Sequence, residues 1–451
     1  MAIDRRTMLA LAAGFLDSGM ASRNLTRTAL DNVRGAFIAG FPLFEFARTA
    51  WSVAGPTPER PGGGFNILTH RRRLTDPGSR VITTPNNDCL VSTVRIDLSG
   101  GPLMLNVPDI TTRYFSVIFM DAFTDNFFMI GTRATQGRGG KFLITPPGWH
   151  GTVAKPVTHI RANSVDLWML VRILVNSPDE YPMINALQDL ITIEPLPANT
   201  LARFLAVPPR DIKDPSNFLD IANQMLSRTP ARDSRTKRAA RFTGAGLRRG
   251  VLNVFSSLDP GLQTRWRDMI PATLSTLPSA GASHRRLANG WSYSLLNTGR
   301  FGDDDEQRAQ IALIGLAALP PEEAFYGHAL SDADGAALVG THRYRLTIPP
   351  GGLPVNAFWS LTLYKVEPDG RLFLASNPIG RYSIGDRTHD LVYNANGSFD
   401  ILMQHERPPG ALVANWLPTP EGPFRPALRA YLAKPALLSL KWTMPPIERI
   451  A

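Results

Sequence analysis

The chain has 451 residues, of which 43% are hydrophobic and 19% are charged. This composition excludes a disordered protein, and the length exceeds what one hydrophobic core normally supports, so we expect two or three domains. The formal net charge of +10 favours anionic partners, such as acidic envelope components. Nucleic acid is not expected as a partner, because no helix-turn-helix, zinc-finger or RNA-binding motif accompanies the basic residues.

The first residues have the pattern of a Tat export signal, because Arg5 and Arg6 precede a short run of Leu and Ala. We expect residues 1–28 to be this signal, which predicts a periplasmic or extracellular protein; without export it would be cytoplasmic. No apolar run approaches the roughly 20 residues of a membrane-spanning helix, so no transmembrane span is predicted. Cys89 is the single cysteine. That rules out an intrachain disulfide, which suits a Tat substrate that folds before export.

The segment after the signal, residues 29–175, predicts a helix followed by a β domain. Leu30–Trp51 has apolar residues at helical spacing, with a kink or restart expected at Pro42. From about residue 80 onward, short apolar runs alternate with turn residues, which is typical of strands. Val165–Val175 is a further apolar run, and it contains two charged residues, Asp166 and Arg172.

The middle of the chain, residues 176–325, changes to a helical pattern. Ser216–Ser227 begins with a serine suited to capping a helix, and Asp304–Leu319 begins with acids and ends before two prolines. Between them, Ala231–Gly250 is strongly basic and has few large apolar residues. We expect this basic stretch to be a surface loop or an exposed helix.

Residues 326–451 return to a strand pattern. In Ala357–Tyr364, Trp359, Leu361 and Leu363 are expected to face one way, with the residues between them facing the other way. The predicted fold class is therefore mainly β with α. It consists of two β domains joined by a helical middle region.

Local motifs for metals, cofactors and nucleophiles do not occur. The eight histidines never approach one another at metal-ligand spacing, so neither a metal nor a cofactor is predicted. No G-x-S-x-G nucleophile elbow is present, and Cys89 is expected to lie in a strand as a small apolar residue. Whether the protein is an enzyme is left open by these patterns.

Two motif-rich stretches carry a family resemblance. Their motifs lie at Gly40–Leu43, Pro85–Leu90, Asp97–Pro102, Pro108–Phe115, Phe358–Tyr364, Asn377–Gly385, Asn415–Pro418 and Arg429–Tyr431. With these motifs the chain resembles a bacterial exported family that joins domain of unknown function 1254 (N-terminal) to domain of unknown function 1214 (C-terminal). The resemblance implies two jelly-roll-like β sandwiches and no particular reaction. The chain departs from the family pattern at Cys89 and Val91, where Thr and Tyr are more frequent.

Polar and aromatic residues in and near these motifs form the candidate site. Asp88 and Asp121 are the candidate catalytic residues, because two carboxylates that face one pocket suit glycoside cleavage. An arginine offers a planar fork of donors, and aromatic faces can pack against a sugar. The candidate ligand-binding residues are Asn86, Asn87, Arg113, Tyr114, Trp359, Arg381, Tyr382, Asn415, Trp416 and Arg429.

Each candidate also has a purely structural interpretation. Asn and Asp side chains at a strand start often bond their own backbone as Asx turns. An inward arginine can bond turn carbonyls, and aromatic residues at strand spacing usually pack in a core.

We predict an exported protein that binds or processes a glycan-like or other polar, envelope-associated or imported small molecule in a cleft between two β sandwiches. The alternatives are a glycosidase-like hydrolase that uses carboxylates and a non-catalytic structural or assembly protein; a homo-oligomer is compatible with each. The ligand hypotheses require Asp88, Arg113, Arg381 and Asn415 to line one cavity. Four residues bonded separately within their own domains would argue against them.

Overall fold

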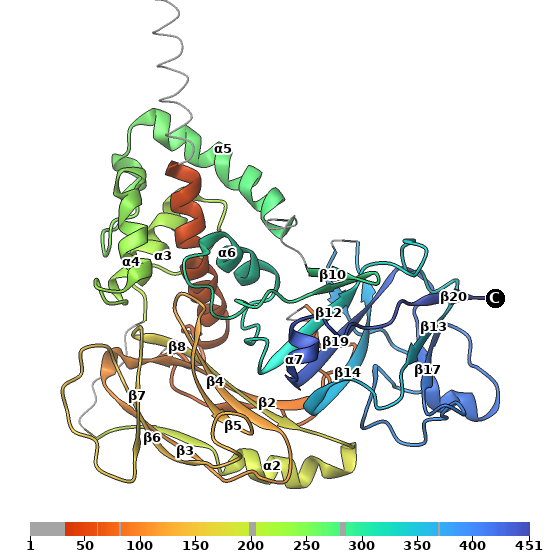
Figure 1. Ribbon diagram of the computed structural model, residues 1–451. Helices are drawn as coiled ribbons and strands as arrows, with labels where there is room; N and C mark the ends of the chain where they lie inside the picture. Colours follow the sequence, from red (N-terminus) through yellow and green to blue (C-terminus); the bar gives the residue numbers. More distant parts are fainter. Residues whose placement is uncertain (1–31, 61, 81–82, 198–203, 280–285, 369) are drawn as a thin grey trace, which may run out of the picture.

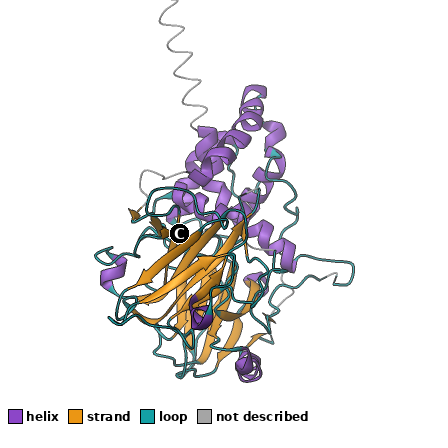
Figure 2. Cartoon of the chain, turned by 90° about the vertical axis from the view of Figure 1, so that its right-hand side faces the viewer, coloured by secondary structure: helices purple, strands orange, loops and turns teal. Residues whose placement is uncertain are grey.

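The computed structural model describes residues 32–451 except 61, 81–82, 198–203, 280–285 and 369 (Figure 1). The predicted export signal, residues 1–28, lies outside the described residues. The described chain forms two β sandwiches and a helical part, so the predicted fold class, mainly β with α, is confirmed. Most of the helices gather at one end of the molecule, and the strands lie together at the other (Figure 2).

The first sandwich consists of a five-stranded and a four-stranded sheet. The five-stranded sheet has the order β1-β2-β8-β4-β5, with the bounds Thr69–His70, Cys89–Asp97, Asp166–Leu174, Phe115–Asp121 and Asn126–Gly131. The four-stranded sheet has the order β7-β6-β3-β9, with the bounds Thr158–Arg161, Gly140–Thr145, Leu103–Val107 and Thr192–Pro195. Apolar side chains of both sheets form the core between them. β9 lies beyond residue 175, where this domain was expected to end, and it pairs with β3.

The outer face of the five-stranded sheet is the surface against which the rest of the molecule packs. Side chains alternate along β2, so Leu90 and Val94 enter the sandwich core, whereas Cys89 and Val91 point outward. Helices cover one end of this outer face, and the second sandwich covers the other (Figure 1). All three parts of the protein therefore meet along β2, β8 and β4.

The helical part packs around the N-terminal helix, residues 32–54, which continues through Pro42 without the expected break. The other helices here are α3 (Pro215–Ser227), α4 (Ser234–Ala239), α5 (Pro260–Thr276) and α6 (Asp305–Ile314). α3 begins one residue earlier than predicted, because Asp214 caps it by accepting a hydrogen bond from the Ser216 amide. The rings of Phe37 and Phe218, 4.8 Å apart, join the N-terminal helix to α3 in a shared apolar core.

The second sandwich also has two sheets. The larger has the order β10-β11-β12-β19-β14-β15, with β16 also paired to β14; the bounds are Arg286–Ala288, Trp291–Tyr293, Ala324–Ala329, Phe424–Ala433, Val355–Val366, Leu372–Phe373 and Ser383–Gly385. The smaller has the order β18-β17-β13-β20, with the bounds Trp416–Pro418, Phe399–Gln404, Arg343–Ile348 and Glu448–Ile450. β10 and β11 precede residue 326, where this domain was expected to begin, and β11 pairs with β12.

Short helices connect these elements. They are η1 (Leu98–Gly100), η2 (Pro178–Glu180), α2 (Tyr181–Asp189), η3 (Ala240–Ala245), η4 (Phe255–Ser257), η5 (Leu277–Ser279), η7 (Gly410–Asn415) and α7 (Pro435–Leu438). Among the residues that the structure describes, no helix combines the length and the apolar character needed to cross a bilayer.

The alternation predicted along β14 is confirmed. Trp359 and Leu361 lie in the core between the two sheets of the second sandwich, whereas Phe358 faces the first sandwich. There Phe358 joins an apolar cluster that includes Cys89 and Tyr114. The two sandwiches are therefore held face to face by packed side chains, and the candidate site lies at this contact.

Candidate functional site

Asp88 lies between the two sandwiches, immediately before β2. Asn86 shapes this strand start, because its side-chain oxygen accepts hydrogen bonds from the amides of Asp88 at 3.0 Å and Cys89 at 2.9 Å. The Asp88 carboxylate is 1% exposed and accepts hydrogen bonds from Ser360 Oγ at 2.8 Å and Arg387 Nη2 at 3.2 Å. Both donors belong to the second sandwich, so both carboxylate oxygens help to join the two domains.

The neighbouring asparagines are bonded to protein groups as well. Asn86 Nδ2 donates to the Tyr431 hydroxyl at 2.8 Å, across the contact between the sandwiches. Asn87 Nδ2 donates to the Thr75 carbonyl at 2.6 Å, within the first sandwich. These two candidate ligand-binding residues thus fix the backbone before β2 and its contact with β19.

Arg429 crosses the same contact from β19. Its Nη2 donates to the Thr84 carbonyl at 2.8 Å, and its Nη1 donates to Thr362 Oγ1 at 3.2 Å. Nearby, the Tyr364 hydroxyl donates to the Pro85 carbonyl at 2.7 Å. The segment that precedes β2 is therefore held by the second sandwich at several points, and Arg429 contributes to this attachment.

Tyr114 and Tyr431 meet in an aromatic cluster between the sandwiches. The Phe358 and Tyr431 rings stack at 4.1 Å, and the Tyr114 ring lies 5.0 Å from that of Tyr431. The Tyr114 hydroxyl donates to Glu323 Oε1 at 2.7 Å, and Arg133 Nε donates to the other oxygen of Glu323 at 2.7 Å. Burial raises the pKa of both tyrosines well above 10, so both remain neutral hydroxyl groups at neutral pH.

Arg172 projects from β8 into this region, and sequence reasoning did not include it among the site residues. Its neighbours are the phenols of Tyr114, Tyr326 and Tyr431 and the thiol of Cys89. Its Nη1 is shielded from solvent without a hydrogen-bond partner, and no hydrogen bond or ion pair joins its guanidinium to any described residue. The available signal was that the apolar run Val165–Val175 contains two charged residues, Asp166 and Arg172. The structure thus places a cation with no hydrogen-bond or ion-pair partner among the described residues next to the apolar cluster between the sandwiches.

Cys89 is buried, as predicted for a small apolar residue in a strand. Burial raises the pKa of its thiol to about 12. A thiol with that pKa is not ionised at neutral pH, and the thiolate is the reactive form. Cys89 is therefore inert. Within the described ranges, no group of three or more His, Cys, Asp or Glu side chains could hold a metal ion.

Arg113 does not reach this region. Its Nη1 donates to Glu180 Oε2 at 2.8 Å and to the Leu174 carbonyl at 3.0 Å, both within the first sandwich. The hydrogen bond from Arg113 is the main reason that the pKa of Glu180 falls to about 2. Arg113 thus has the structural role of an inward arginine with a carboxylate and a carbonyl partner.

Arg381 and Asn415 also bond only within their own sandwich. Arg381 Nη1 donates to three carbonyls in and after η7, at 2.8 to 3.0 Å. The Asn415 side chain accepts from the Val392 amide at 2.8 Å and donates to the carbonyls of Val392 and Asp400. The four residues expected to line one cavity are therefore hydrogen-bonded in separate places: Asp88 between the sandwiches, Arg113 in the first, and Arg381 and Asn415 in the second.

The two candidate tryptophans of the second sandwich do not offer free faces. Trp359 is 2% exposed in the sandwich core. Trp416 is 1% exposed, and its Nε1 donates to the Gln404 carbonyl at 2.8 Å. Tyr382 is half-buried beside the apolar cluster around Tyr364. Trp359 and Trp416 therefore have no exposed face on which a sugar could stack.

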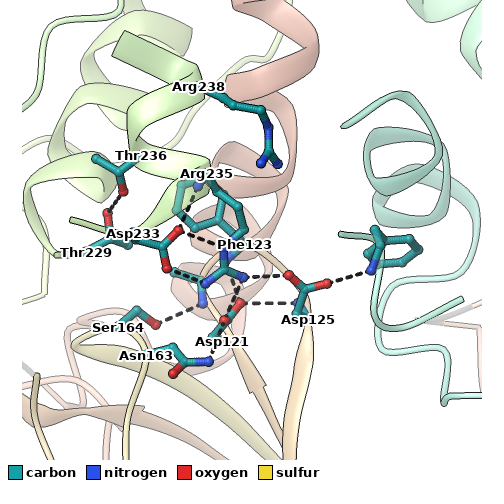
Figure 3. Close-up of polar contacts among 12 residues, drawn as sticks. Asp121, Phe123, Asp125, Asn163, Ser164, Thr229, Asp233, Arg235, Thr236 and Arg238 are labelled. Atoms are coloured by element: carbon teal, nitrogen blue, oxygen red, sulfur yellow. Dashed lines mark hydrogen bonds and ion pairs between the residues drawn. The ribbon is translucent and has the colours of Figure 1, made fainter. Parts of the chain in front are cut away.

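Asp121 belongs to a separate ion-pair network under the helices (Figure 3). It is fully buried, and its Oδ2 lies 2.8 Å from Arg235 Nη1, which also contacts Asp125 Oδ2 at 2.6 Å. Arg235 Nη2 forms an ion pair with Asp233 Oδ2 at 2.7 Å. Asp125 Oδ2 also forms an ion pair with Arg308 Nη1 at 2.6 Å. The network fastens the helical part to the end of β4, so its carboxylates are structural.

The two candidate catalytic carboxylates are far apart, which corrects the hydrolase hypothesis. Asp88 precedes Cys89, which pairs with Leu174, whereas Asp121 pairs with Leu167. These partners are seven positions apart on β8, or about 23 Å at ~3.3 Å per residue. Paired carboxylates in glycosidases are about 5 to 9.5 Å apart. The two residues therefore cannot act on one glycosidic bond.

Much of the basic stretch expected at the surface is engaged in structure. Arg235 holds the network described above, and Arg238 pairs with Asp305 at 2.8 Å. Arg249 donates to the carbonyls of Leu226 and Ser227 at 3.0 Å, at the C-terminal end of α3. Cations at that end of a helix satisfy its free carbonyls. These arginines therefore organise the helical part.

Comparison with known proteins agrees with this architecture. A family model described as "Protein of unknown function (DUF1254)" matches residues 65–195, and one described as "Protein of unknown function (DUF1214)" matches residues 323–435. No curated protein matches the chain.

Two solved structures are similar to the chain. The crystal structure of the VPA0106 protein from Vibrio parahaemolyticus has a TM-score of 0.72 and 23% sequence identity, and the match covers 94% of this chain and 100% of that one. It shares the fold. An uncharacterized protein from Burkholderia cenocepacia has a TM-score of 0.43 and 13% identity, with 99% of each chain covered. On the two family matches, in their order and positions, this chain belongs to the tandem DUF1254/DUF1214 family.

Proposed function

We propose that this protein binds an organic carboxylate between its two β sandwiches, at the guanidinium of Arg172. The observation that supports the proposal is the unpaired cation itself. Leaving a buried donor unsatisfied costs about 1–3 kcal/mol, and a charged donor costs more. Natural sequences retain such groups mainly at functional sites, where a ligand supplies the missing partner.

The surroundings of Arg172 indicate the class of ligand. A single guanidinium balances one negative charge, and its planar fork matches the two oxygens of a carboxylate. The neighbouring Tyr114, Tyr326 and Tyr431 belong to the apolar cluster between the sandwiches, and such surroundings suit a ligand with an apolar or aromatic body. A sugar is a weaker candidate, because Trp359 and Trp416 lie in a protein core.

The geometry supports binding better than hydrolysis. Asp88 is bonded through both oxygens to Ser360 and Arg387, so it is not free to act as an acid or base. The Asp121 carboxylate is paired with the Arg235 guanidinium, and it lies at the other end of the sheet. A hydrolase built on these two residues is therefore not proposed.

A thermal-shift comparison of acids with neutral analogues tests the proposal. We expect benzoate and octanoate to raise the melting temperature and benzamide and octanol not to do so. A ligand at 100 times its Kd stabilises by about 2.7 kcal/mol. An unfolding entropy of about 2.1 cal/mol/K per residue gives ~0.95 kcal/mol/K for a chain of this length. Dividing the stabilisation by this entropy gives a rise in melting temperature of about 3 °C.

Two variants make this test specific. Arg172→Met is expected to abolish the shift with the acids, whereas Arg73→Met, which removes an exposed arginine of the same sandwich, is expected to keep it. Equal shifts with acids and neutral analogues, or an acid shift that persists in Arg172→Met, would refute the proposal.

We also propose that the protein is exported, on the basis of the Arg5-Arg6 pair and the apolar residues after it. Cell fractionation should then find the protein in the periplasm or medium. Changing both arginines to lysine should leave the uncleaved precursor in the cytoplasm. Equal distribution of the two forms would contradict export through this signal.

A further inference from the structure

A second arginine, Arg95, lies on the same face of the five-stranded sheet and has no hydrogen-bond or ion-pair partner among the described residues. Arg95 of β2 is 5% exposed, and its guanidinium lies 3.5 Å from the centroid of the Trp168 ring and 5.8 Å from that of Phe46. Its Nη1 is shielded and unbonded, and its side chain makes no hydrogen bond or ion pair with the residues described. Burial lowers the pKa of Arg95 to about 9, so the group is still charged at neutral pH.

The sheet register fixes the spacing of the two arginines. Val91 pairs with Arg172, and Arg95 pairs with Trp168, so all four side chains lie on the outer face of β2 and β8. The two arginines are therefore four positions apart along the strands, or about 13 Å at ~3.3 Å per residue. Thr93 of β2 lies midway between the two positions.

The positions of β2 and β8 that lie between the two arginines carry no charged side chain. Val91 and Leu170 are apolar, and the Thr93 hydroxyl already accepts a hydrogen bond from Trp168 Nε1 at 2.6 Å. Val91 and Thr93 are only partly buried, although helices and the second sandwich cover the two ends of this face. The result is an apolar strip with an unpaired cation at each end.

We propose that the ligand is an elongated molecule with an acidic group at each end, one bound by Arg172 and the other by Arg95. The proposal rests on the proposed function and adds the second contact. An extended chain advances about 1.2 Å per bond, so a span of about 13 Å corresponds to a linear dicarboxylic acid of roughly ten to twelve carbons. Two charges of the same ligand then neutralise both arginines.

Calorimetric titration with linear dicarboxylates and with monocarboxylates of equal length tests the inference on the full-length protein. We expect the diacid affinity to peak at roughly ten to twelve carbons. There it should exceed that of the matched monoacid by about tenfold to hundredfold, as expected for one added charge-assisted contact. Arg95→Met should lower the affinity for the diacid to that for the matched monoacid, and an unchanged circular dichroism spectrum shows that the variant is folded.

The possible results separate the two proposals. If the monoacid binds through Arg172 but the diacid binds no better, or if its advantage survives in Arg95→Met, the two-ended ligand is wrong and the proposed function stands. If neither acid depends on Arg172, both proposals fail. Arg73→Met again provides the control for general effects of charge.

Discussion

Replacing Arg172 with methionine is expected to stabilise the protein when no ligand is bound. The guanidinium has no hydrogen-bond or ion-pair partner among the described residues, and its Nη1 is shielded from solvent. Methionine has a similar length and no charge, and its sulfur packs well against aromatic rings such as those around Arg172. Removing a group that serves a ligand, not the fold, should raise stability.

The size of this effect follows from the surroundings of Arg172. Relief of one unsatisfied buried donor contributes about 1–3 kcal/mol, and a sulfur–aromatic contact adds about 0.3–1.5 kcal/mol. Since part of the side chain remains accessible, we expect a net gain of about 2 kcal/mol. With ~0.95 kcal/mol/K for the unfolding entropy, the melting temperature should rise by about 2 °C.

Differential scanning calorimetry of the ligand-free protein measures this effect. Arg113→Met is the matched comparison, because Arg113 lies in the same sandwich but is paired with Glu180. It should lower the melting temperature, so the two variants should change stability in opposite directions. If Arg172→Met lowers the melting temperature as much as Arg113→Met, then Arg172 has a structural partner and the reasoning fails.

Three further predictions concern the structural groups. Arg235→Met should destabilise the protein by about 3–5 kcal/mol in denaturant titrations, because it leaves buried carboxylates unpaired. As a control, Arg232→Met, which removes an exposed arginine nearby, should change stability by less than about 0.5 kcal/mol. Glu180 has its pKa lowered from 4.5 to about 2, so its contribution is complete above pH 4.5 and disappears as the pH falls towards 2. Glu180→Gln should therefore destabilise at pH 7 and become nearly neutral at pH 2; equal effects at both pH values would contradict this. Cys89 should resist iodoacetamide at pH 8 in the native protein and react after unfolding, since burial raises its pKa to about 12; rapid native labelling would contradict its burial.

Local sequence patterns predicted the elements of the fold well, because they depend on short-range geometry. The alternation along β14 correctly separated Trp359 from Phe358, since side chains of a strand point to opposite faces in turn. The Asx turn of Asn86 was also visible locally. The continuation of the N-terminal helix through Pro42 was not, because tertiary packing of its apolar faces outweighs the preference of proline.

The site could be predicted only in part, because its contacts join residues far apart in the chain. The sequence showed Arg172 and Asp166 inside an apolar run. The phenols of Tyr326 and Tyr431 reach Arg172 only through packing of one sandwich on the other. In the same way, nothing local connects Asp121 with Arg235, which occurs in a stretch that has the composition of a surface loop. Motif membership made Asp88 a candidate catalytic residue in a cleft, without revealing that Ser360 and Arg387 of the second sandwich occupy its oxygens.

A crystal structure of the protein with para-bromobenzoate would test the central claim most directly, because the anomalous signal of bromine locates the ligand without bias. We predict a bromine peak between the two sandwiches, with the carboxylate oxygens within hydrogen-bond distance of the Arg172 guanidinium. Bromine found only elsewhere, or Arg172 bonded to a protein carboxylate in the crystal, would contradict the account.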